Sequence, residues 1–165
     1  LFEASKASSG NLELNMEKID ITQLLRQAIG EMEEKLSNAN LDLKLRVPEE
    51  KTYINADGKK LYRVLENLLS NISKYSLDNT RVYIDIVQDN GKVKLTMKNI
   101  SSYELNFDPD EIMERFKRAD ESRNTEGSGL GLAIARDLVN AQGGRFEIDI
   151  DGDLFKAVIE FNLID

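Results

Sequence analysis

The sequence predicts an α+β fold of two layers, in which three helices cover one face of a mixed, mostly antiparallel sheet. Three stretches place apolar residues at the spacing of amphipathic helices, and five shorter stretches alternate apolar and polar residues as half-buried strands do. Two junctions between strands carry Asn90-Gly91 and Asp151-Gly152, which favour tight hairpin turns. With 165 residues, the chain has the length of one domain.

The first half of the chain is expected to hold two helices with a strand between them. Residues 21–38 form the first helix, and residues 41–47 form a strand that Pro48 ends, because proline cannot continue a ladder of hydrogen bonds. Asp57 is the expected N-cap of a second helix that continues through Tyr75. The apolar positions of the first helix are Leu24, Leu25, Ala28, Met32 and Leu36.

A hairpin is expected after the second helix. Residues 81–87 and 92–98 alternate as strands, and Asp89-Asn90-Gly91 joins them, since Asn-Gly tolerates the positive φ angles that such a turn needs. The region that follows, residues 99–128, is irregular, with a short helix expected at residues 110–116.

The C-terminal part is expected to add a third helix and a second hairpin. Residues 130–141 carry an apolar stripe at helical spacing, and Gly143-Gly144 ends that helix. Strands at residues 146–150 and 157–161 then pair through Asp151-Gly152.

The composition excludes several classes of protein. Hydrophobic residues make up 41% and charged residues 32% of the chain, as in ordinary globular domains. Cysteine and histidine are absent, which excludes disulfides and the usual zinc sites, favours a reducing cytosol and leaves no histidine to be phosphorylated. A net charge of −8 has the wrong sign for a nucleic-acid partner. No apolar run approaches the roughly 18 residues of a membrane span, and the start without methionine leads us to expect a piece of a longer protein.

The second helix carries a polar stripe. At about 100° per residue, Arg63, Asn67, Asn71 and Lys74 fall on one side of it, with Tyr75 at the edge of the stripe. A carboxamide oxygen suits Mg²⁺, which takes one or two protein oxygens and completes its shell with phosphate oxygens and water. A lysine there meets phosphate charge, and a tyrosine stacks on a base. The alternative interpretation is a solvated helix face on which the asparagines stand by chance.

Two further segments are candidates for phosphate contacts. Gly127, Gly129 and Gly131 alternate with other residues directly before the third helix, where a backbone without Cβ atoms and a helix N-terminus favour phosphate. Their spacing fits neither a Walker loop nor a dinucleotide fingerprint, and a flexible loop is the alternative. In the charged run upstream, Arg118 and Arg123 are candidates for a terminal phosphate, whereas a solvated surface is the usual interpretation of such a run.

Together these segments resemble the ATP-binding domain of sensor histidine kinases, in the GHKL superfamily with its Bergerat fold. RVLENLLSNISKYS is similar to the asparagine box of that family, IMERFKRAD to its phenylalanine box, and GSGLGLAIARDLVNAQGGRFEI to its second glycine box and the following helix and strand. The opening LFEASKASSGNLELN is similar to the end of the phosphoacceptor-domain helix and its linker, so we expect residues 1–12 to be that segment and residues 13–165 the catalytic domain.

The resemblance implies ATP and Mg²⁺ as cofactors and assigns a role to each site residue. Asn71 would be the metal ligand with Asn67 beside it, Lys74 would contact phosphate, and Tyr75 would pack near the adenine. The residues implied at the far end of the triphosphate are Arg118, on the γ-phosphate, and Gly127, Gly129, Leu130 and Gly131, along the phosphates. Asn67, Lys74 and Arg118 would be the catalytic set.

One box departs from the family pattern. The family has Asp-x-Gly-x-Gly after the first hairpin, where the aspartate accepts a hydrogen bond from the adenine amino group. Here Lys98-Asn99-Ile100-Ser101-Ser102 stands in that place, a form that resembles a variant in kinases of Gram-positive bacteria. The Asn99 carbonyl oxygen can accept the same bond but carries no charge.

The implied activity is transfer of the γ-phosphoryl group of ATP to a histidine on a separate phosphoacceptor domain of a two-component sensor kinase. A response regulator would be an indirect partner, and the full-length protein would be a membrane-anchored homodimer with this domain in the cytoplasm. A hydrolytic GHKL ATPase is one alternative, but it needs a carboxylate base where Asn67 stands, and Glu66 lies about 100° away from the stripe. A degenerate pseudokinase that uses the fold for protein contacts is the other.

Overall fold

The computed structural model describes residues 13–105, 111 and 131–165. The expected linker at residues 1–12 and the short helix expected at residues 110–116 therefore lie outside the described residues, apart from Glu111. In chain order the elements are β1 (Met16–Asp20), α2 (Ile21–Asn38), β2 (Asp42–Arg46), β3 (Tyr53–Asp57), α3 (Gly58–Tyr75), β4 (Arg81–Asp89), β5 (Lys92–Ile100), α5 (Gly131–Ala141), β6 (Arg145–Asp151) and β7 (Leu154–Asn162). No helix within the described ranges is long and apolar enough to cross a bilayer.

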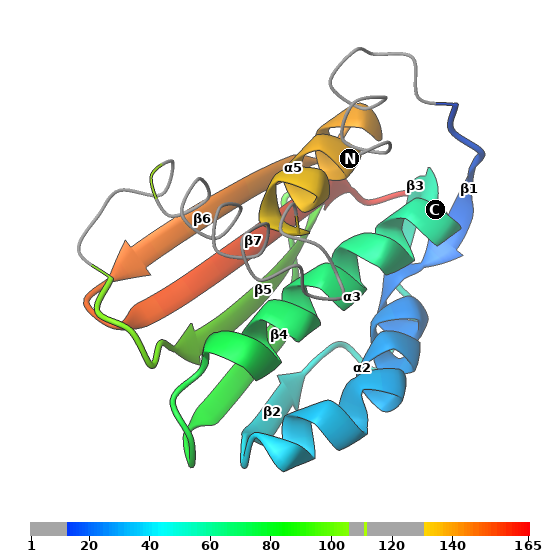
Figure 1. Cartoon of the computed structure of the whole chain (residues 1–165). Helices are drawn as coiled ribbons and strands as arrows, with labels where there is room; N and C mark the ends of the chain where they lie inside the picture. Colours follow the sequence, from blue (N-terminus) through cyan, green and yellow to red (C-terminus); the bar gives the residue numbers. More distant parts are fainter. Residues whose placement is uncertain (1–12, 106–110, 112–130) are drawn as a thin grey trace.

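The main sheet has the strand order β2-β4-β5-β7-β6 (Figure 1). β2 pairs with β4 in parallel, and the other three pairings are antiparallel, which confirms the mixed, mostly antiparallel sheet. The two predicted hairpins are confirmed as β4–β5 and β6–β7, and both turns use backbone with positive φ, at Asn90 (52°), Gly91 (75°) and Gly152 (62°). Pairing of β5 with β7 joins the two hairpins into one sheet.

A second, two-stranded sheet was not expected from the sequence. β1 and β3 pair antiparallel, with Ile19 opposite Ile54. Both strands are only five residues long, and β1 has one aliphatic residue besides its first methionine, so neither gives a clear alternating pattern. Their pairing depends on chain segments far apart in the sequence, which local patterns do not reveal.

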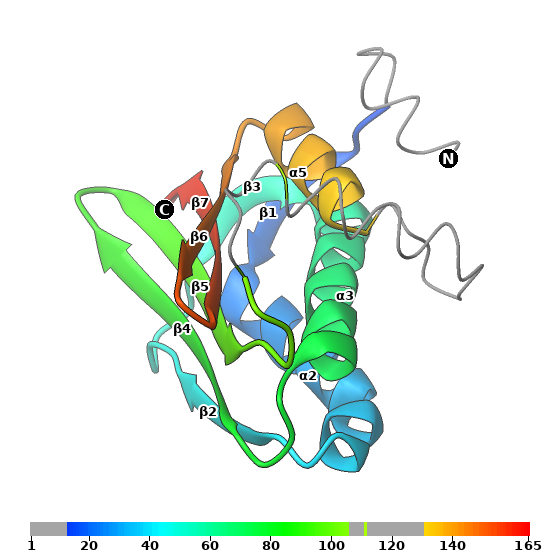
Figure 2. The same ribbon diagram turned by 60° about the vertical axis from the view of Figure 1, so that its left-hand side comes forward.

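Three helices lie on one face of the main sheet, as predicted (Figure 2). The strands turn their alternate apolar residues toward these helices, and the opposite face of the sheet carries charged residues such as Arg46, Asp85 and Lys98. The sheet residues buried in this core are Val82, Ile84, Ile86, Val93, Leu95, Met97, Phe155, Ala157, Ile159 and Phe161. Helix α3 lies between α2 and α5 and contacts both, so its two sides face different neighbours.

Aspartates begin the first two helices. The Asp20 side chain accepts hydrogen bonds from the backbone N–H groups of Thr22 (3.1 Å) and Thr52 (3.2 Å), which ties α2 to the start of β3. Asp57, the predicted N-cap of α3, accepts from the backbone N–H of Lys60 at 3.0 Å. Its other oxygen accepts from the N–H of Asn15 at 2.9 Å.

Asp57 also connects α3 with the end of α5. Its backbone N–H donates to Oε1 of the buried Gln142 at 2.8 Å, and Gln142 Nε2 donates to the carbonyl of Leu138. Burial alone raises the pKa of the Asp57 carboxyl, but the hydrogen bonds from the N–H groups of Asn15 and Lys60 outweigh it and bring this pKa below its usual value. The carboxylate of Asp57 thus joins the segment before β1 to the start of α3, and its backbone N–H joins the same point to Gln142 after α5.

Candidate functional site

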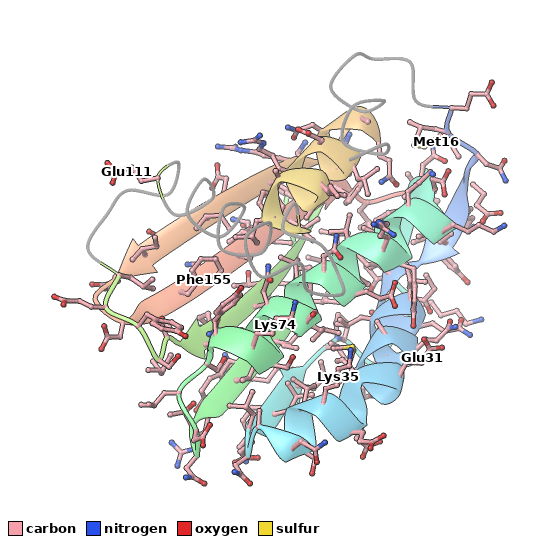
Figure 3. All side chains as sticks on the ribbon, in the orientation of Figure 1. Met16, Glu31, Lys35, Lys74, Glu111 and Phe155 are labelled. Carbon is pink, nitrogen blue, oxygen red and sulfur yellow. The ribbon has the colours of Figure 1, made fainter. Side chains whose placement is uncertain are left out.

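A pocket opens between the C-terminal half of α3 and the ends of the central strands. Its lining is mostly apolar, with three polar side chains among the wall residues. The residues around it are Leu68, Asn71, Ile72, Tyr75, Met97, Asn99, Ser101, Leu132, Phe155 and Ala157. Figure 3 shows Phe155 at the beginning of β7 and Lys74 on the C-terminal half of α3. An apolar slot with a few polar groups is the usual form of a site for a flat organic ligand.

The two asparagines of the α3 stripe face α5. Asn67 and Asn71 are each 9% exposed, so they do not belong to a solvated helix face. Asn67 Nδ2 lies 3.4 Å from the carbonyl oxygen of Gly131, the first residue of α5. A Cβ atom at Gly131 would lie 3.7 Å from Nδ2 and 3.8 Å from Oδ1 of Asn71, so the start of α5 passes directly over the pair.

Asn71 has an unsatisfied amide group. Its Nδ2 is buried and has no hydrogen-bond partner within the part of the chain that the structure describes. A buried donor without a partner costs roughly 1–3 kcal/mol, which a bound polar ligand would recover. The same carboxamide has an oxygen of the type that Mg²⁺ accepts, and one such oxygen is enough when phosphate and water supply the rest of the shell.

The polar groups that line this site include the carboxamides of Asn71 and Asn99, and the described residues contain no group of three or more Asp, Glu, His or Cys side chains that could hold a metal ion. Such a site binds Mg²⁺ weakly by itself and fits an ion that arrives with a phosphate ligand. Glu66, the acidic neighbour of Asn67, is exposed and lies off the asparagine face of the helix. Among the described residues, the site therefore offers no carboxylate base beside the asparagines.

The other two predicted residues of α3 lie at its C-terminal end. Lys74 is exposed in the last turn of α3, directly before the pocket residue Tyr75 (Figure 3). Tyr75 is buried and forms part of the wall. Its ring lies 6.2 Å from that of Tyr103 at an angle of 59°, and Tyr103 is 53% exposed. Two aromatic rings thus stand together at this end of the pocket.

Asn99, expected directly after the strand of residues 92–98, lies within the last residues of β5 and lines the pocket. It is 5% exposed and pairs in register with Phe155 of β7. Its Nδ2 donates to the Ser76 hydroxyl at 2.8 Å. In this arrangement the carbonyl Oδ1 can accept a hydrogen bond from a ligand, and the second N–H of the amide can still donate one.

The segment after Asn99 is built without the glycines of the family pattern. Ser102 donates to the carbonyl of Tyr75 through both its backbone N–H (2.8 Å) and its hydroxyl (3.0 Å). The Ser101 hydroxyl accepts from the backbone N–H of Tyr103 at 3.0 Å. Serine hydroxyls commonly stabilise such turns by bonding to nearby backbone. The substituted box is therefore fastened to the end of α3.

Several predicted residues lie outside the described residues. These are Arg118, Arg123, Gly127, Gly129 and Leu130. Within the described ranges, the structure brings together Asn67, Asn71, Tyr75, Asn99 and Gly131, which come from three elements. The apolar wall from the sheet was not predicted. The strands expected at residues 92–98 and 157–161 include Met97 and Ala157, and the structure extends them to Asn99 and Phe155 on the same face. Ser76, which directly follows the predicted helix, was not predicted either.

Comparison with known proteins agrees with this geometry. Residues 56–162 match the family model described as histidine kinase-, DNA gyrase B-, and HSP90-like ATPase. The chain is 33% identical over 150 residues to the probable sensor protein PcoS of Escherichia coli, which covers 90% of the chain and 32% of PcoS. The fold is similar to that of the Acinetobacter baumannii histidine kinase AdeS, with a TM-score of 0.79 at 20% identity over 99% of this chain and 75% of that one. It is also similar to full-length ShkA in complex with AMPPNP, with a TM-score of 0.77 at 24% identity over 98% of this chain and 34% of that one.

Proposed function

Because the chain belongs to the family of histidine kinase-, DNA gyrase B- and HSP90-like ATPases, as an ATP-binding domain of the histidine kinase type, we propose that it binds Mg²⁺-ATP and transfers the γ-phosphoryl group to a histidine on a separate domain of a sensor kinase. The observation that carries the proposal is one pocket that has at one side the buried Asn71 amide nitrogen, which has no hydrogen-bond partner among the described residues, and at its floor the side chain of Asn99. The similarity to ShkA, whose structure was solved in complex with AMPPNP, supports the choice of nucleotide.

The phosphate end of the proposed site is the face of α3 under the start of α5. Asn71 would supply an oxygen to Mg²⁺, and Asn67 would stand beside it in the shell of metal and phosphate. When bound, the ion neutralises the charge of the phosphate oxygens. Lys74, in the last turn of α3, would add a positive charge against the net charge of −8 on the chain. Arg118 and the glycines 127, 129 and 131 remain proposed contacts of the phosphates.

The base end of the proposed site lies between Tyr75 and the sheet. The apolar wall would take the adenine ring, and Asn99 Oδ1 would accept a hydrogen bond from its amino group. Phosphoryl transfer requires little covalent chemistry from the protein, and its rate depends mainly on positioning and on charge stabilisation. A pocket that grips the base at one end and the metal at the other is suited to that task.

The acceptor would come from outside the chain, because the sequence contains no histidine. The chain spans about a third of PcoS, so the phosphoacceptor domain, a response regulator, a membrane anchor and a homodimer all belong to the proposal for the longer protein. A hydrolytic role is less well supported, since Asn67 cannot take a proton and Glu66 is exposed. Asn99, which stands where the family has an aspartate, favours a degenerate pseudokinase that uses the fold for protein contacts as the second candidate. A nucleotide titration tests whether the chain binds ATP, as the kinase must.

The test is calorimetry of Mg²⁺-ATP with the wild type and two variants. Asn71→Ala should weaken binding by about tenfold or more, because the proposed metal ligand and the amide donor are both lost. Asn140→Ala, at an exposed position near the end of α5, is the matched control and should bind as the wild type does. Unchanged binding by Asn71→Ala would remove this residue from the site. In a chain that includes the phosphoacceptor domain, loss of phosphohistidine should accompany the loss of binding.

A further inference from the structure

A hollow of about 710 Å³ lies on the face of the main sheet that the helices leave uncovered. Figure 2 shows this face on the side of the sheet away from α2, α3 and α5. The hollow is found where β5 ends and where β4 and β7 begin, and its walls include the outward-facing Arg81, Tyr83, Lys98, Ile100 and Leu154. A concave surface of this kind, with one aromatic ring, two aliphatic side chains and two cations, suits a ligand that is partly apolar and negatively charged.

The strand register places three cations side by side on this face. Lys98 of β5 is directly opposite Lys156 of β7. Lys98 is also opposite Tyr83 of β4, and Arg81 lies two residues before Tyr83 on the same face of that strand. We call Arg81, Lys98 and Lys156 the cationic cluster. Like charges directly opposite each other destabilise a sheet, so an anion bound beside the two lysines would relieve a cost.

The other cations of this face have carboxylate partners, which the cationic cluster lacks. Arg46 binds Asp85 through two hydrogen bonds, of 2.5 and 2.9 Å. Further pairs on the same face are Lys44–Asp42, Lys94–Glu160 and Arg145–Glu147. Arg81 and Lys156 form no ion pair with any of the described residues, and Lys98 reaches only Asp85, at 4.0 Å, whose carboxylate Arg46 already holds. Ion pairs that merely keep the sheet face soluble therefore account for the rest of this face but not for the cluster.

We propose that the cationic cluster is a docking site for an acidic segment of a partner protein. Carboxylates of that segment would pair with the three cations, and one of its apolar side chains would pack in the hollow against Tyr83, Ile100 and Leu154. The surface lies on the other side of the sheet from the helix layer that carries the asparagines (Figure 2). The inference therefore goes beyond the proposed function and does not depend on nucleotide binding.

Tyr83 gives the docking surface a fixed centre. Arg46 lies over its ring at 5.1 Å from the centroid, and the amine of Lys98 lies at 5.8 Å. The side chains of Tyr83, Ile100 and Leu154 are each half-buried, so each is held by the sheet and still presents part of its surface. Because the ring is already held between two cations, little ordering is needed when a partner binds, and aromatic anchors of this kind are common at the centre of interfaces.

Acidic residues border the cationic cluster and limit the kind of anion that fits. Asp42 of β2 pairs in register with Arg81, and Asp149 of β6 pairs in register with Lys156. A nucleic acid or an anionic membrane would extend over these carboxylates and would be repelled by them and by the net charge of −8. A short segment with two or three carboxylates fits between the acidic borders, which favours a protein partner.

The experiment is an NMR titration of the isotope-labelled chain with two short peptides at low salt. One peptide has three glutamates around a leucine, and the other has glutamine in place of each glutamate. The wild type should bind the glutamate peptide about tenfold more tightly or better, with the largest shifts in β4, the end of β5 and the start of β7. Arg81→Gln and Lys156→Gln should each weaken this binding by about two- to fivefold, the effect of one partly exposed ion pair. With all three cations replaced by glutamine, the two peptides should bind alike.

Lys35→Gln is the matched control, because it makes the same change in net charge at an exposed position on α2, in the helix layer (Figure 3). It should bind the glutamate peptide as the wild type does. The proposal is overturned if the wild type does not distinguish the two peptides, or if Lys35→Gln weakens binding as much as Lys156→Gln does. Tighter binding of a phosphatidylserine vesicle or a DNA duplex than of the glutamate peptide would also overturn it. If circular dichroism shows that the triple variant does not fold, the two single variants decide.

Discussion

Replacing Asn99 by aspartate would restore the charge that the family's adenine contact carries. The structure shows that the exchange keeps the existing hydrogen bond possible: Ser76 Oγ accepts from Asn99 Nδ2 now, and its hydroxyl would donate to the carboxylate in the variant. The side chain of residue 99 would otherwise occupy the same place opposite Phe155. The variant thus changes the charge and the donor capacity of the site with little change of shape.

The expected gain follows from the difference between neutral and charged hydrogen bonds. A neutral bond contributes about 0.5–1.5 kcal/mol and a charge-assisted one about 1.5–3 kcal/mol, so the midpoints differ by about 1.25 kcal/mol, a little less than the roughly 1.4 kcal/mol of a tenfold change in affinity. Two effects reduce it. The carboxylate would be buried, since Asn99 is 5% exposed, and it would add to a net charge of −8. We therefore expect Asn99→Asp to bind ATP up to about tenfold more tightly.

The assay is a titration of Mg²⁺-ATP on the wild type, Asn99→Asp and Asn99→Ala at neutral pH. Asn99→Ala should weaken ATP and relax the preference for ATP over GTP, because the residue is expected to contact the base and not the phosphates. The gain in Asn99→Asp should be lost as the pH falls through the pKa of the new carboxyl. An Asn99→Ala variant with an unchanged ratio of ATP to GTP affinity would show that the adenine is bound by other groups.

Three further predictions concern catalysis and stability. The isolated chain should hydrolyse ATP only slowly, since no carboxylate of the described residues lies beside Asn67 and Asn71; rapid phosphate release in a steady-state assay would favour the hydrolytic alternative. Gly144→Ala should destabilise the domain by roughly 1–3 kcal/mol in urea unfolding, because a Cβ there would lie 2.9 Å from atoms of Phe161 and Val139. Gly30→Ala on α2 should stabilise the domain by about 0.5–1 kcal/mol, because the space around that position is open. Equal effects of the two changes would refute that reasoning. The pKa of Asp57 is lowered in the fold, so its ionised carboxylate stabilises the fold at pH values above the unfolded pKa, near 4. This stabilisation should be lost as the pH falls through the folded pKa. In acid titrations, Asp57→Asn should therefore lose less stability than the wild type.

The helices and hairpins were predictable because their signals are local. The N-cap at Asp57 and the turn at Asn90-Gly91 each depend on a few neighbouring residues, and the structure confirms both. The pairing of β1 with β3 was not predictable, since each strand is short and its partner lies more than thirty residues away, as in the match of Ile19 with Ile54.

The candidate site was likewise predictable from the sequence in part only. The positions of Asn67 and Asn71 on one side of α3 follow from helical periodicity, but their burial depends on α5, and periodicity cannot tell a covered face from a solvated one. The partner of Asn99 was also hidden. Ser76 and Asn99 are brought together by the packing of a helix end on a strand end, a contact that no motif records.

The pairing of β5 with β7, which forms the central seam of the main sheet, has a consequence for how the domain folds. Two hairpins form from neighbouring residues, but β5 and β7 meet across a large separation, as Lys92 and Asn162 are partners 70 positions apart. Closing such a loop costs chain entropy before the pairing returns any stabilisation, so non-local strands generally join late and slowly. The floor of the pocket spans this seam, with Met97 and Asn99 on one strand and Phe155 and Ala157 on the other. The pocket is therefore assembled only when the two halves of the chain have docked, and a nucleotide held there would act as a clamp that slows their separation.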